Sequence, residues 1–205
     1  MTFVRRLAPL ICAGALGLLV SCAHQDVDGA PKSAEIRPYA DEPYNVRPID
    51  RSKFASRFRP ATVTAPVGYA PGTIVVDTSA RQLYFILGDG KARRYGIAVG
   101  ASGHAWSGVA TIGRMAKWPA WYPTDDMRSD APELPHRIEP GPGNPLGARA
   151  LYLYKNGIDT LYRIHGTSEP WTIGKEVSSG CIRMVNEDVM ELYAHVSKGT
   201  VVFVL

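Results

Sequence analysis

Residues 178–184 read Ser-Ser-Gly-Cys-Ile-Arg-Met, and the triplet His165-Gly166-Thr167 lies a short distance before them. A thiol is mostly protonated at pH 7, with a free pKa of about 8.5, but a neighbouring imidazole can accept its proton. The two segments therefore predict a thiolate–imidazolium pair, in which Cys181 is the nucleophile and His165 is its general base. We expect His165 to end a strand and Cys181 to lie on a loop just before a helix.

The residues beside the cysteine suit the same chemistry. Gly180 lets the backbone turn tightly and leaves room for a substrate carbonyl group. The backbone N–H groups of Ser179, Gly180 and Cys181 would then point at the oxyanion of a tetrahedral intermediate. Ser178 is expected to form a hydrogen bond within the loop. Arg183 either binds a substrate carboxylate or forms an ion pair that supports the loop.

The first 21 residues have the pattern of an export signal. Arg5 and Arg6 give it a positive start, and residues 7–20 are almost wholly apolar. This apolar run is shorter than the roughly 20 residues that a membrane-spanning helix needs, so we expect it to be cleaved from the mature protein.

The signal ends in Leu19-Val20-Ser21-Cys22, which resembles the bacterial lipobox, where a small residue precedes a cysteine that becomes lipidated. We therefore expect Cys22 to be a lipid-anchored N-terminus; the alternative is an ordinary signal peptide whose apolar region contains Cys22. Ala23, in place of Asp, points to the outer membrane of a Gram-negative bacterium, with the domain in the periplasm. Cys12 would leave with the signal, so Cys181 would be the one thiol of the mature chain, which favours a chemical role in an oxidising compartment.

The charge balance excludes a nucleic-acid-binding protein. The formal charge of +4 falls by two when residues 1–21 are removed, because they contain two arginines and no acidic residue. The sequence contains no Lys/Arg run, P-loop, dinucleotide fingerprint or paired-cysteine metal motif. We expect no cofactor, no metal and no nucleic-acid partner. A zinc site of His165, Cys181 and His195, the metal alternative, matches no common ligand spacing.

Residues 22–71 are predicted to form a lipidated N-terminus and a proline-rich tether. They show no sustained hydrophobic period of 2 or 3.6, and prolines interrupt any helix, at positions 31, 38, 43, 48, 60 and 66. Phe54 and Phe58 are the side chains that would dock on the following domain. An extended tether of this length would span on the order of 100 Å, enough to reach from a membrane into a neighbouring layer.

Residues 72–205 are predicted to form a mostly β domain, a sandwich or open barrel with one main helix after the cysteine. Runs of β-branched and aromatic residues predict strands at 73–77, 82–87, 93–99, 151–154, 160–165 and 201–205. Glycine-rich residues 88–91 and the Asn156-Gly157 pair predict two hairpin turns. Residues 100–147, rich in Gly, Pro and Trp, are expected to form long loops.

The helix is predicted to begin at Asn186, a good N-cap, with Glu187 and Asp188 in its first turn. Its apolar residues recur at helical spacing, at Val189, Leu192, Tyr193 and Val196. Gly199 suits the C-terminal cap. His195 is expected on the solvent side.

The stretch from His165-Gly166-Thr167 through Gly174 to residues 178–184, followed by Asn186, Asp188, Leu192 and Tyr193, resembles the L,D-transpeptidase catalytic domain, also called the YkuD domain. Supporting pieces are Ile74-Val75-Val76-Asp77, Leu83-Tyr84 and the Pro- and Gly-rich residues 139–147. The resemblance covers residues 72–205.

The resemblance implies a cysteine acyltransferase of the cell wall. Cys181 would attack the carbonyl between the L-centre of diaminopimelate and the terminal D-alanine of a peptidoglycan tetrapeptide stem, releasing D-alanine and leaving a thioester. An amine of a second stem, or a lysine of an envelope protein, would resolve the thioester. His165 would act first as base and then as acid, and the backbone carbonyl of Gly166 would orient its imidazole.

The sequence departs from the family pattern at two places. Ser179 stands where the family usually has histidine, and residues 107–113 stand in place of a compact proline-threonine-glycine segment. Trp118, Trp121 and Tyr122 either wall a substrate groove or pack within the fold. The alternative functions are an L,D-carboxypeptidase or cysteine peptidase with the same Cys–His pair, and a catalytically silent lipoprotein that binds the cell wall.

Overall fold

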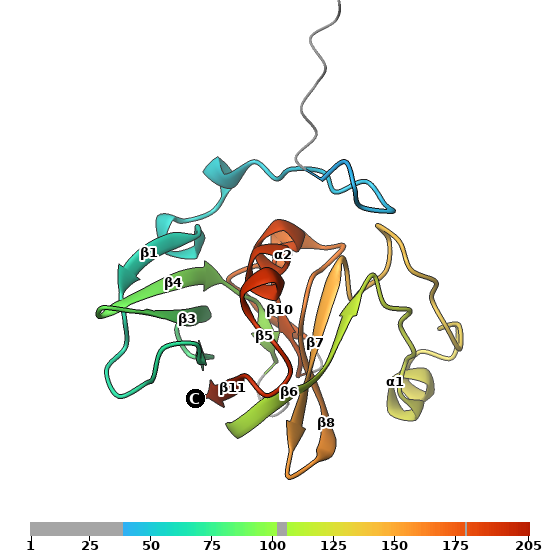
Figure 1. The fold of residues 1–205 in the computed structure, drawn as a ribbon. Coiled ribbons are helices and arrows are strands. Elements are labelled where there is room, and N and C mark those ends of the chain that lie inside the picture. The colour runs from blue at the N-terminus through green and yellow to red at the C-terminus, as the bar shows by residue number, and fades with distance from the viewer. Residues whose placement is uncertain (1–38, 102–105, 179) are drawn as a thin grey trace, which may run out of the picture. The chain divides into compact units, whose positions relative to one another are not determined.

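β-Strands are the main regular structure of the chain from residue 39 onward. The computed structural model describes residues 39–101, 106–178 and 180–205, so the predicted signal peptide, Cys22 and Ser179 lie outside the described residues. Within these ranges, one sheet has the order β1-β4-β3-β2-β11-β6-β7-β8-β10, and β5 pairs with β9 in a second, two-stranded sheet (Figure 1). The strands are β1 (Ala61–Thr64), β2 (Ile74–Asp77), β3 (Gln82–Gly88), β4 (Lys91–Gly96), β5 (Val99–Gly100), β6 (Gly108–Lys117), β7 (Arg149–Lys155), β8 (Ile158–His165), β9 (Glu176–Ser178), β10 (Ile182–Arg183) and β11 (Val201–Val204). The helices are η1 (Arg51–Lys53), η2 (Ser56–Phe58), α1 (Asp125–Asp130), η3 (Pro170–Thr172) and α2 (Asn186–His195).

The two predicted hairpins are present. Strands β3 and β4 are antiparallel neighbours, as are β7 and β8. The turn between β7 and β8 has φ angles of 52° at Asn156 and 79° at Gly157. Positive φ at both central residues is what the tight turn between two strands requires, which is why the Asn-Gly pair predicted it.

Strand β6 corrects the expectation that residues 100–147 form loops. Its ten residues lie between β11 and β7 in the sheet. Ala110 and Ile112 are buried on its inner face. At Gly113 an added Cβ would lie 2.3 Å from the Tyr154 ring, so this position admits no side chain. Glycines at both ends of its short β-branched stretch, at positions 108 and 113, weaken the strand signal in the sequence.

Helix α2 follows the cysteine as expected, but its N-cap differs from the prediction. The N-cap is Val185, and it makes no side-chain capping bond. The Asn186 amide instead accepts a hydrogen bond from Ala148 N at 2.9 Å and donates one to Thr167 O at 3.1 Å. The helix ends at His195, before Gly199, which lies in the following turn with φ of 90°. The Asn186 side chain, which the sequence predicted to cap the helix, therefore forms hydrogen bonds with two distant segments of the chain instead.

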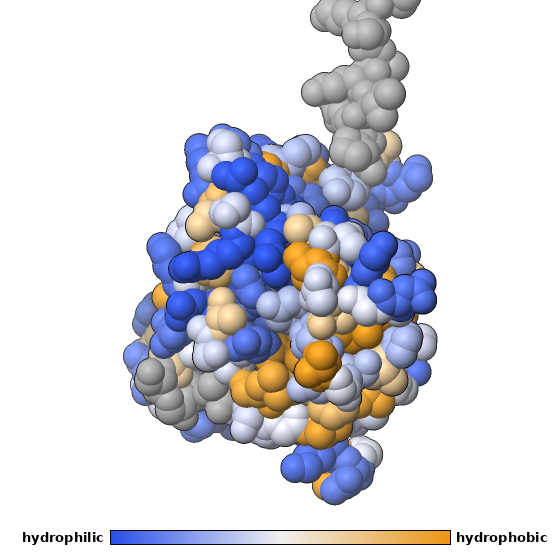
Figure 2. Space-filling view, turned by 90° about the vertical axis from the view of Figure 1, so that its left-hand side faces the viewer, coloured by the Kyte–Doolittle hydropathy of each residue, from blue (hydrophilic) through white to orange (hydrophobic). Residues whose placement is uncertain are grey.

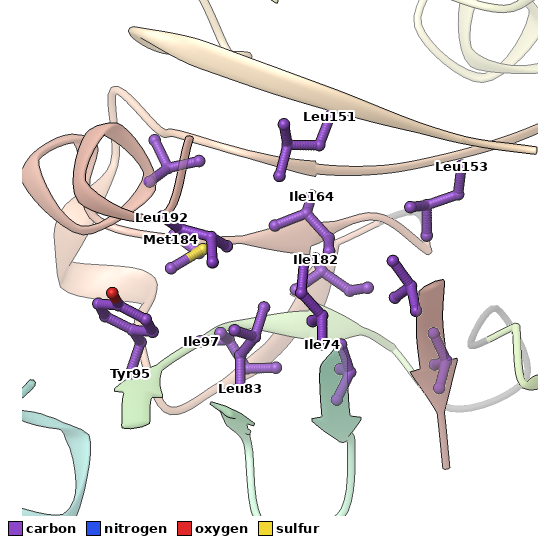
Figure 3. Packing of buried hydrophobic residues seen from close by; sticks show 14 of the residues in the cluster. Ile74, Leu83, Tyr95, Ile97, Leu151, Leu153, Ile164, Ile182, Met184 and Leu192 are labelled. Carbon is purple, nitrogen blue, oxygen red and sulfur yellow. The ribbon is translucent and has the colours of Figure 1, made fainter. Parts of the chain in front are cut away.

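The main core lies between strands β2 and β3 on one side and β7 and β8 on the other, and α2 packs against it. Figure 3 shows side chains of β2, β3, β7, β8 and α2 pointing toward one another across it, among them Leu83, Leu151, Ile164 and Leu192. Each is fully buried. Burial of one such side chain contributes about 1.5–3 kcal/mol, so this cluster is a main source of stability. The mostly β fold with one main helix is confirmed.

The N-terminal part of the described chain differs from the expected extended tether. Residues 39–60, which we call the strap, pack along the domain, and β1 continues them into the sheet beside β4 (Figure 1). Phe58 is buried against Gly96 and Gly174, where an added Cβ would come within 2.5 Å of its atoms. Phe54 packs beside the same cluster. Both predicted docking side chains therefore contact the domain.

The face of the molecule on the left-hand side of Figure 1 carries both hydrophilic and apolar residues. Figure 2 shows mostly hydrophilic residues at the level of the strap and apolar patches below them. Exposed apolar side chains include Val67 and Leu87. No helix among the described residues is long and apolar enough to cross a membrane.

Candidate active site

The pairing of two strands brings the predicted nucleophile and base to one face of the sheet. β10 runs parallel to β8, with Ile182 opposite Ile164 and Arg183 opposite His165. Side chains alternate along a strand, so the two isoleucines face the core while the residues on either side face away from it. Cys181 and His165 accordingly line the same pocket.

The pocket has a volume of about 350 Å³. More than half of its lining residues come from residues 119–147, which we call the active-site loop. The lining is Arg114, Ala120, Trp121, Tyr122, Pro123, Thr124, Met127, Pro145, Leu146, Tyr152, Leu161, Arg163, His165, Cys181 and Arg183. Of the three aromatic residues considered in the sequence, Trp121 and Tyr122 wall the pocket, whereas Trp118 packs in a separate buried cluster with Val46 and Ala148.

The imidazole of His165 is buried and fixed by its neighbour. Its Nδ1 lies 2.6 Å from the carbonyl oxygen of Gly166. A carbonyl oxygen only accepts hydrogen bonds, so Nδ1 carries the proton and Nε2 is the nitrogen that can accept one. Burial lowers the pKa of His165 to about 4, and the positive charges of Arg183 and Arg163 act in the same direction. The imidazole is therefore neutral at pH 7.

Cys181 is also held in its neutral form. Its Sγ lies 3.9 Å from the carbonyl oxygen of Leu161. Burial raises the pKa of the Cys181 thiol above its usual value, and the charge of Arg163 only partly offsets this. The sequence predicted a thiolate–imidazolium pair. The structure instead favours a neutral thiol and a neutral imidazole, because burial disfavours both charges.

Three arginines give the pocket a positive wall. The guanidinium carbons of Arg114 and Arg163 lie 4.3 and 4.8 Å from the ring centre of Tyr152. Arg183 forms an ion pair with Glu169 at 2.9 Å, one of the two roles left open for it. Arg114 was not predicted, because β6 was not recognised and the strand alternation that directs this side chain was therefore not visible.

The segment before the cysteine has the expected glycine geometry. Gly180 has φ of 123°, a conformation that residues with a side chain rarely adopt. Ser178 ends β9. Ser179 lies outside the described residues, so the arrangement of the predicted oxyanion donors stays a prediction.

The third residue of the zinc alternative lies outside the pocket. His195 is exposed on α2, and its ring packs 6.0 Å from that of Phe85. Within the described residues, no group of three or more His, Cys, Asp or Glu side chains is placed to hold a metal ion.

A family model for the L,D-transpeptidase catalytic domain, YkuD, matches residues 71–204. The chain belongs to this family. The match begins within one residue of the expected start of the L,D-transpeptidase domain, and it excludes the strap.

Two curated relatives carry L,D-transpeptidase names. This family member is 33% identical over 149 residues to the probable L,D-transpeptidase ErfK/SrfK of Salmonella typhimurium. The aligned region covers 69% of this chain and 46% of that protein. The chain is also 32% identical over 149 residues to the probable L,D-transpeptidase YbiS of Escherichia coli, with the same two shares. The chain thus spans about half the length of these L,D-transpeptidases.

A solved structure from Brucella melitensis is also similar to this L,D-transpeptidase family member. It is named a probable carnitine operon oxidoreductase, is 48% identical, has a TM-score of 0.51, and covers 72% of this chain and 94% of that chain. The similarity extends over most of the described residues.

Proposed function

We propose that this protein is an L,D-transpeptidase that acts on peptidoglycan tetrapeptide stems through a Cys181 thioester. The observation that carries the proposal is the meeting of Cys181 and His165 in one pocket, with the His165 imidazole oriented by the Gly166 carbonyl. Family membership supports the reaction class, and the positive wall of the pocket supports an anionic substrate.

The first half of the reaction begins from neutral groups. As the sulfur–carbon bond forms, the Cys181 thiol proton passes to Nε2 of His165, and the oxyanion develops. Collapse of this intermediate breaks the carbon–nitrogen bond. The imidazolium then protonates the amine of the leaving D-alanine, so that a thioester and a neutral imidazole remain. Proton transfer during attack avoids a stable ion pair in a buried site.

The second half reverses these roles. An acceptor amine attacks the thioester carbonyl and gives its proton to His165, the carbon–sulfur bond breaks, and the Cys181 thiolate recovers the proton. The acceptor is a second stem, which yields a cross-link, a free D-amino acid, or the lysine of an envelope protein. Water as the acceptor would give an L,D-carboxypeptidase.

The pocket wall suits peptide carboxylates. A guanidinium group binds a carboxylate with two parallel hydrogen bonds, and Arg114 and Arg163 lie on the wall near Cys181. Trp121 and Tyr122 offer flat apolar surfaces to the rest of the stem. We further propose that lipidation at Cys22 anchors the protein to the outer membrane, with this pocket in the periplasm.

The deciding experiment is incubation of the full chain with purified tetrapeptide muropeptides, followed by mass analysis of the products. D-Alanine loss together with a cross-linked dimer is expected. Cys181→Ala should abolish D-alanine release, and His165→Ala should reduce it by about 10²–10⁴-fold, because base and acid are lost together. Loss of D-alanine with hydrolysis alone would assign a carboxypeptidase. Stem binding without turnover would assign the silent wall-binding alternative.

A further inference from the structure

The strap joins the two ends of the active-site loop. Glu42 accepts a hydrogen bond from Trp118 Nε1 at 2.7 Å, just before the loop begins. The same carboxylate binds both terminal nitrogens of Arg149, just after the loop ends, with Nη1 at 2.9 Å. Trp118 N donates to Ala148 O at 2.8 Å, so the loop closes at this point. One strap carboxylate therefore connects both ends of the segment that forms most of the pocket wall.

The connection is largely shielded from solvent, and its arginine is buried. The Arg149 side chain is 5% exposed and that of Glu42 is 16% exposed. The Arg149 hydrogen bond lowers the pKa of Glu42, so the carboxylate is ionised at neutral pH. Removing one member of a buried ion pair leaves the other charge unpaired, which is far more costly than loss of a surface pair.

Strap aromatic residues support the same point. The ring of Tyr44 packs 4.9 Å from that of Trp118, and Val46 is buried in the same cluster. Trp118 has φ of 45°, a left-handed conformation that is rare for a bulky residue and persists only where surrounding contacts fix it. The strap supplies several of those contacts.

The connection also reaches the general base. Arg149 O accepts a hydrogen bond from Gly166 N at 3.0 Å, and Ala150 lies opposite His165 in the sheet. Gly166 is the residue whose carbonyl oxygen holds the His165 imidazole. The Glu42–Arg149 pair thus lies next to the backbone that orients the base.

A second attachment holds the strap to the helix that follows the cysteine. Arg51 binds Asp188 through two hydrogen bonds, of 3.0 and 2.7 Å, and Ile49 N donates to Glu187 Oε1 at 2.9 Å. The strap is therefore attached at two places, to the loop ends through Glu42 and to α2 through Ile49 and Arg51.

We propose that the strap is a positioning element of the active site, and that Glu42 is the positioning residue that holds the active-site loop over Cys181. The strap precedes residue 71, where the family match begins, so this role belongs to a segment outside the matched domain. Its effect on stem binding rests on the proposed function, whereas its effect on the loop does not.

The test compares Glu42→Gln with Asp50→Asn in the full chain. Both replace a strap carboxylate by its amide, but Asp50 is exposed, and its carboxylate accepts hydrogen bonds from Ser52 within the strap. We expect Glu42→Gln to speed hydrogen exchange at Trp121 and Ile138, whose amides bond across the loop, about tenfold, with no change in β3 or β4. Cys181 alkylation by iodoacetamide should also accelerate, because a looser loop lets water into the pocket. Asp50→Asn should change neither rate.

Stem kinetics provide the second readout. The KM for a tetrapeptide should rise about tenfold in Glu42→Gln with kcat changed much less, since the loop contributes binding surface. Unchanged loop exchange, or faster exchange with unchanged alkylation and KM, would overturn the positioning role. If neither the wild-type chain nor any variant acts on tetrapeptides, the proposed function fails, while hydrogen exchange and alkylation still decide the role of the strap. If Glu42→Gln does not fold, Trp118→Phe replaces it; this change removes the indole N–H that donates to Glu42, together with part of the ring that packs on Tyr44.

Discussion

The Nδ1 atom of His165 lies 2.6 Å from the carbonyl oxygen of Gly166, its own neighbour in the chain. A backbone carbonyl fixes the tautomer without adding a negative charge beside the imidazole. A carboxylate in this place would stabilise an imidazolium, whereas here burial lowers the pKa of His165 to about 4. The resting Cys181–His165 pair is therefore uncharged, and the thiol becomes reactive only as its proton leaves.

The neutral resting pair predicts how Cys181 reactivity depends on pH. Burial raises the thiol pKa and lowers that of His165, so the thiolate fraction should grow about tenfold per pH unit through pH 6–8. Alkylation by iodoacetamide, followed by mass spectrometry, measures this rate, and Cys181→Ala corrects for other thiols. A rate that is constant between pH 5 and 8 would instead indicate a thiolate–imidazolium pair.

The buried position of Phe58 predicts that the strap contributes to stability. Phe58→Ala should lower the free energy of unfolding by about 3–5 kcal/mol, because the space against Gly96 and Gly174 would be left empty. Urea denaturation measures the change. Phe54→Ala, at a partly buried position of the same cluster, is the matched control and should cost clearly less. Equal effects of the two changes would contradict the assignment.

The parts of the fold that were predicted correctly have local causes. Asn156-Gly157 marks a turn because few other residue pairs tolerate two positive φ angles. Cys181 and His165 line one pocket, as their pairing in the sequence analysis implied, and their catalytic roles stay predictions. Strand β6 escaped notice because Gly113 meets a Tyr154 ring that only the folded chain brings near.

The contacts of the strap could not be predicted for a different reason. Glu42 and Arg149 are 107 residues apart, and nothing near either residue indicates the pairing. Asn186 shows the same limitation, since its amide serves Ala148 and Thr167 in place of a helix cap. Hydrogen bonds between distant residues leave no periodic pattern in the sequence. The proline-rich composition of the strap therefore led to the prediction of an extended tether.

The ordered strap also changes what a lipid anchor at Cys22 could reach. Only residues 23–38 would separate the anchor from the described chain, a maximum of roughly 60 Å at full extension, in place of the 100 Å expected for the whole tether. Cys22→Ser should abolish acylation and move the protein out of the outer-membrane fraction. Fractionation and intact mass measure both effects. An unmodified N-terminus in the wild-type protein would contradict the anchor and leave the proposed reaction untouched.

Arg114 predicts a carboxylate-dependent step in substrate binding. Its side chain is exposed in the pocket, and within the described residues it takes part in no ion pair, whereas Arg183 and Arg163 already face Glu169 and Asp159. We expect Arg114→Ala to raise the KM for a tetrapeptide about tenfold with little change in kcat, because a binding contact is lost. Arg114→Lys should recover only part of the affinity, since an ammonium lacks the two-pronged geometry.

A substrate without carboxylates tests whether Arg114 acts by binding a carboxylate of the stem. With a stem whose carboxylates are amidated, wild type and Arg114→Ala should show similar KM values, because the guanidinium no longer has an anionic partner. Lys155→Ala, which removes an exposed positive charge at the end of β7 outside the pocket, is the control for long-range charge effects and should leave both KM values unchanged. A tenfold defect that persists with the amidated stem would mean that Arg114 supports the pocket through Tyr152, without binding the carboxylate. A fall in kcat would place it in the chemical step.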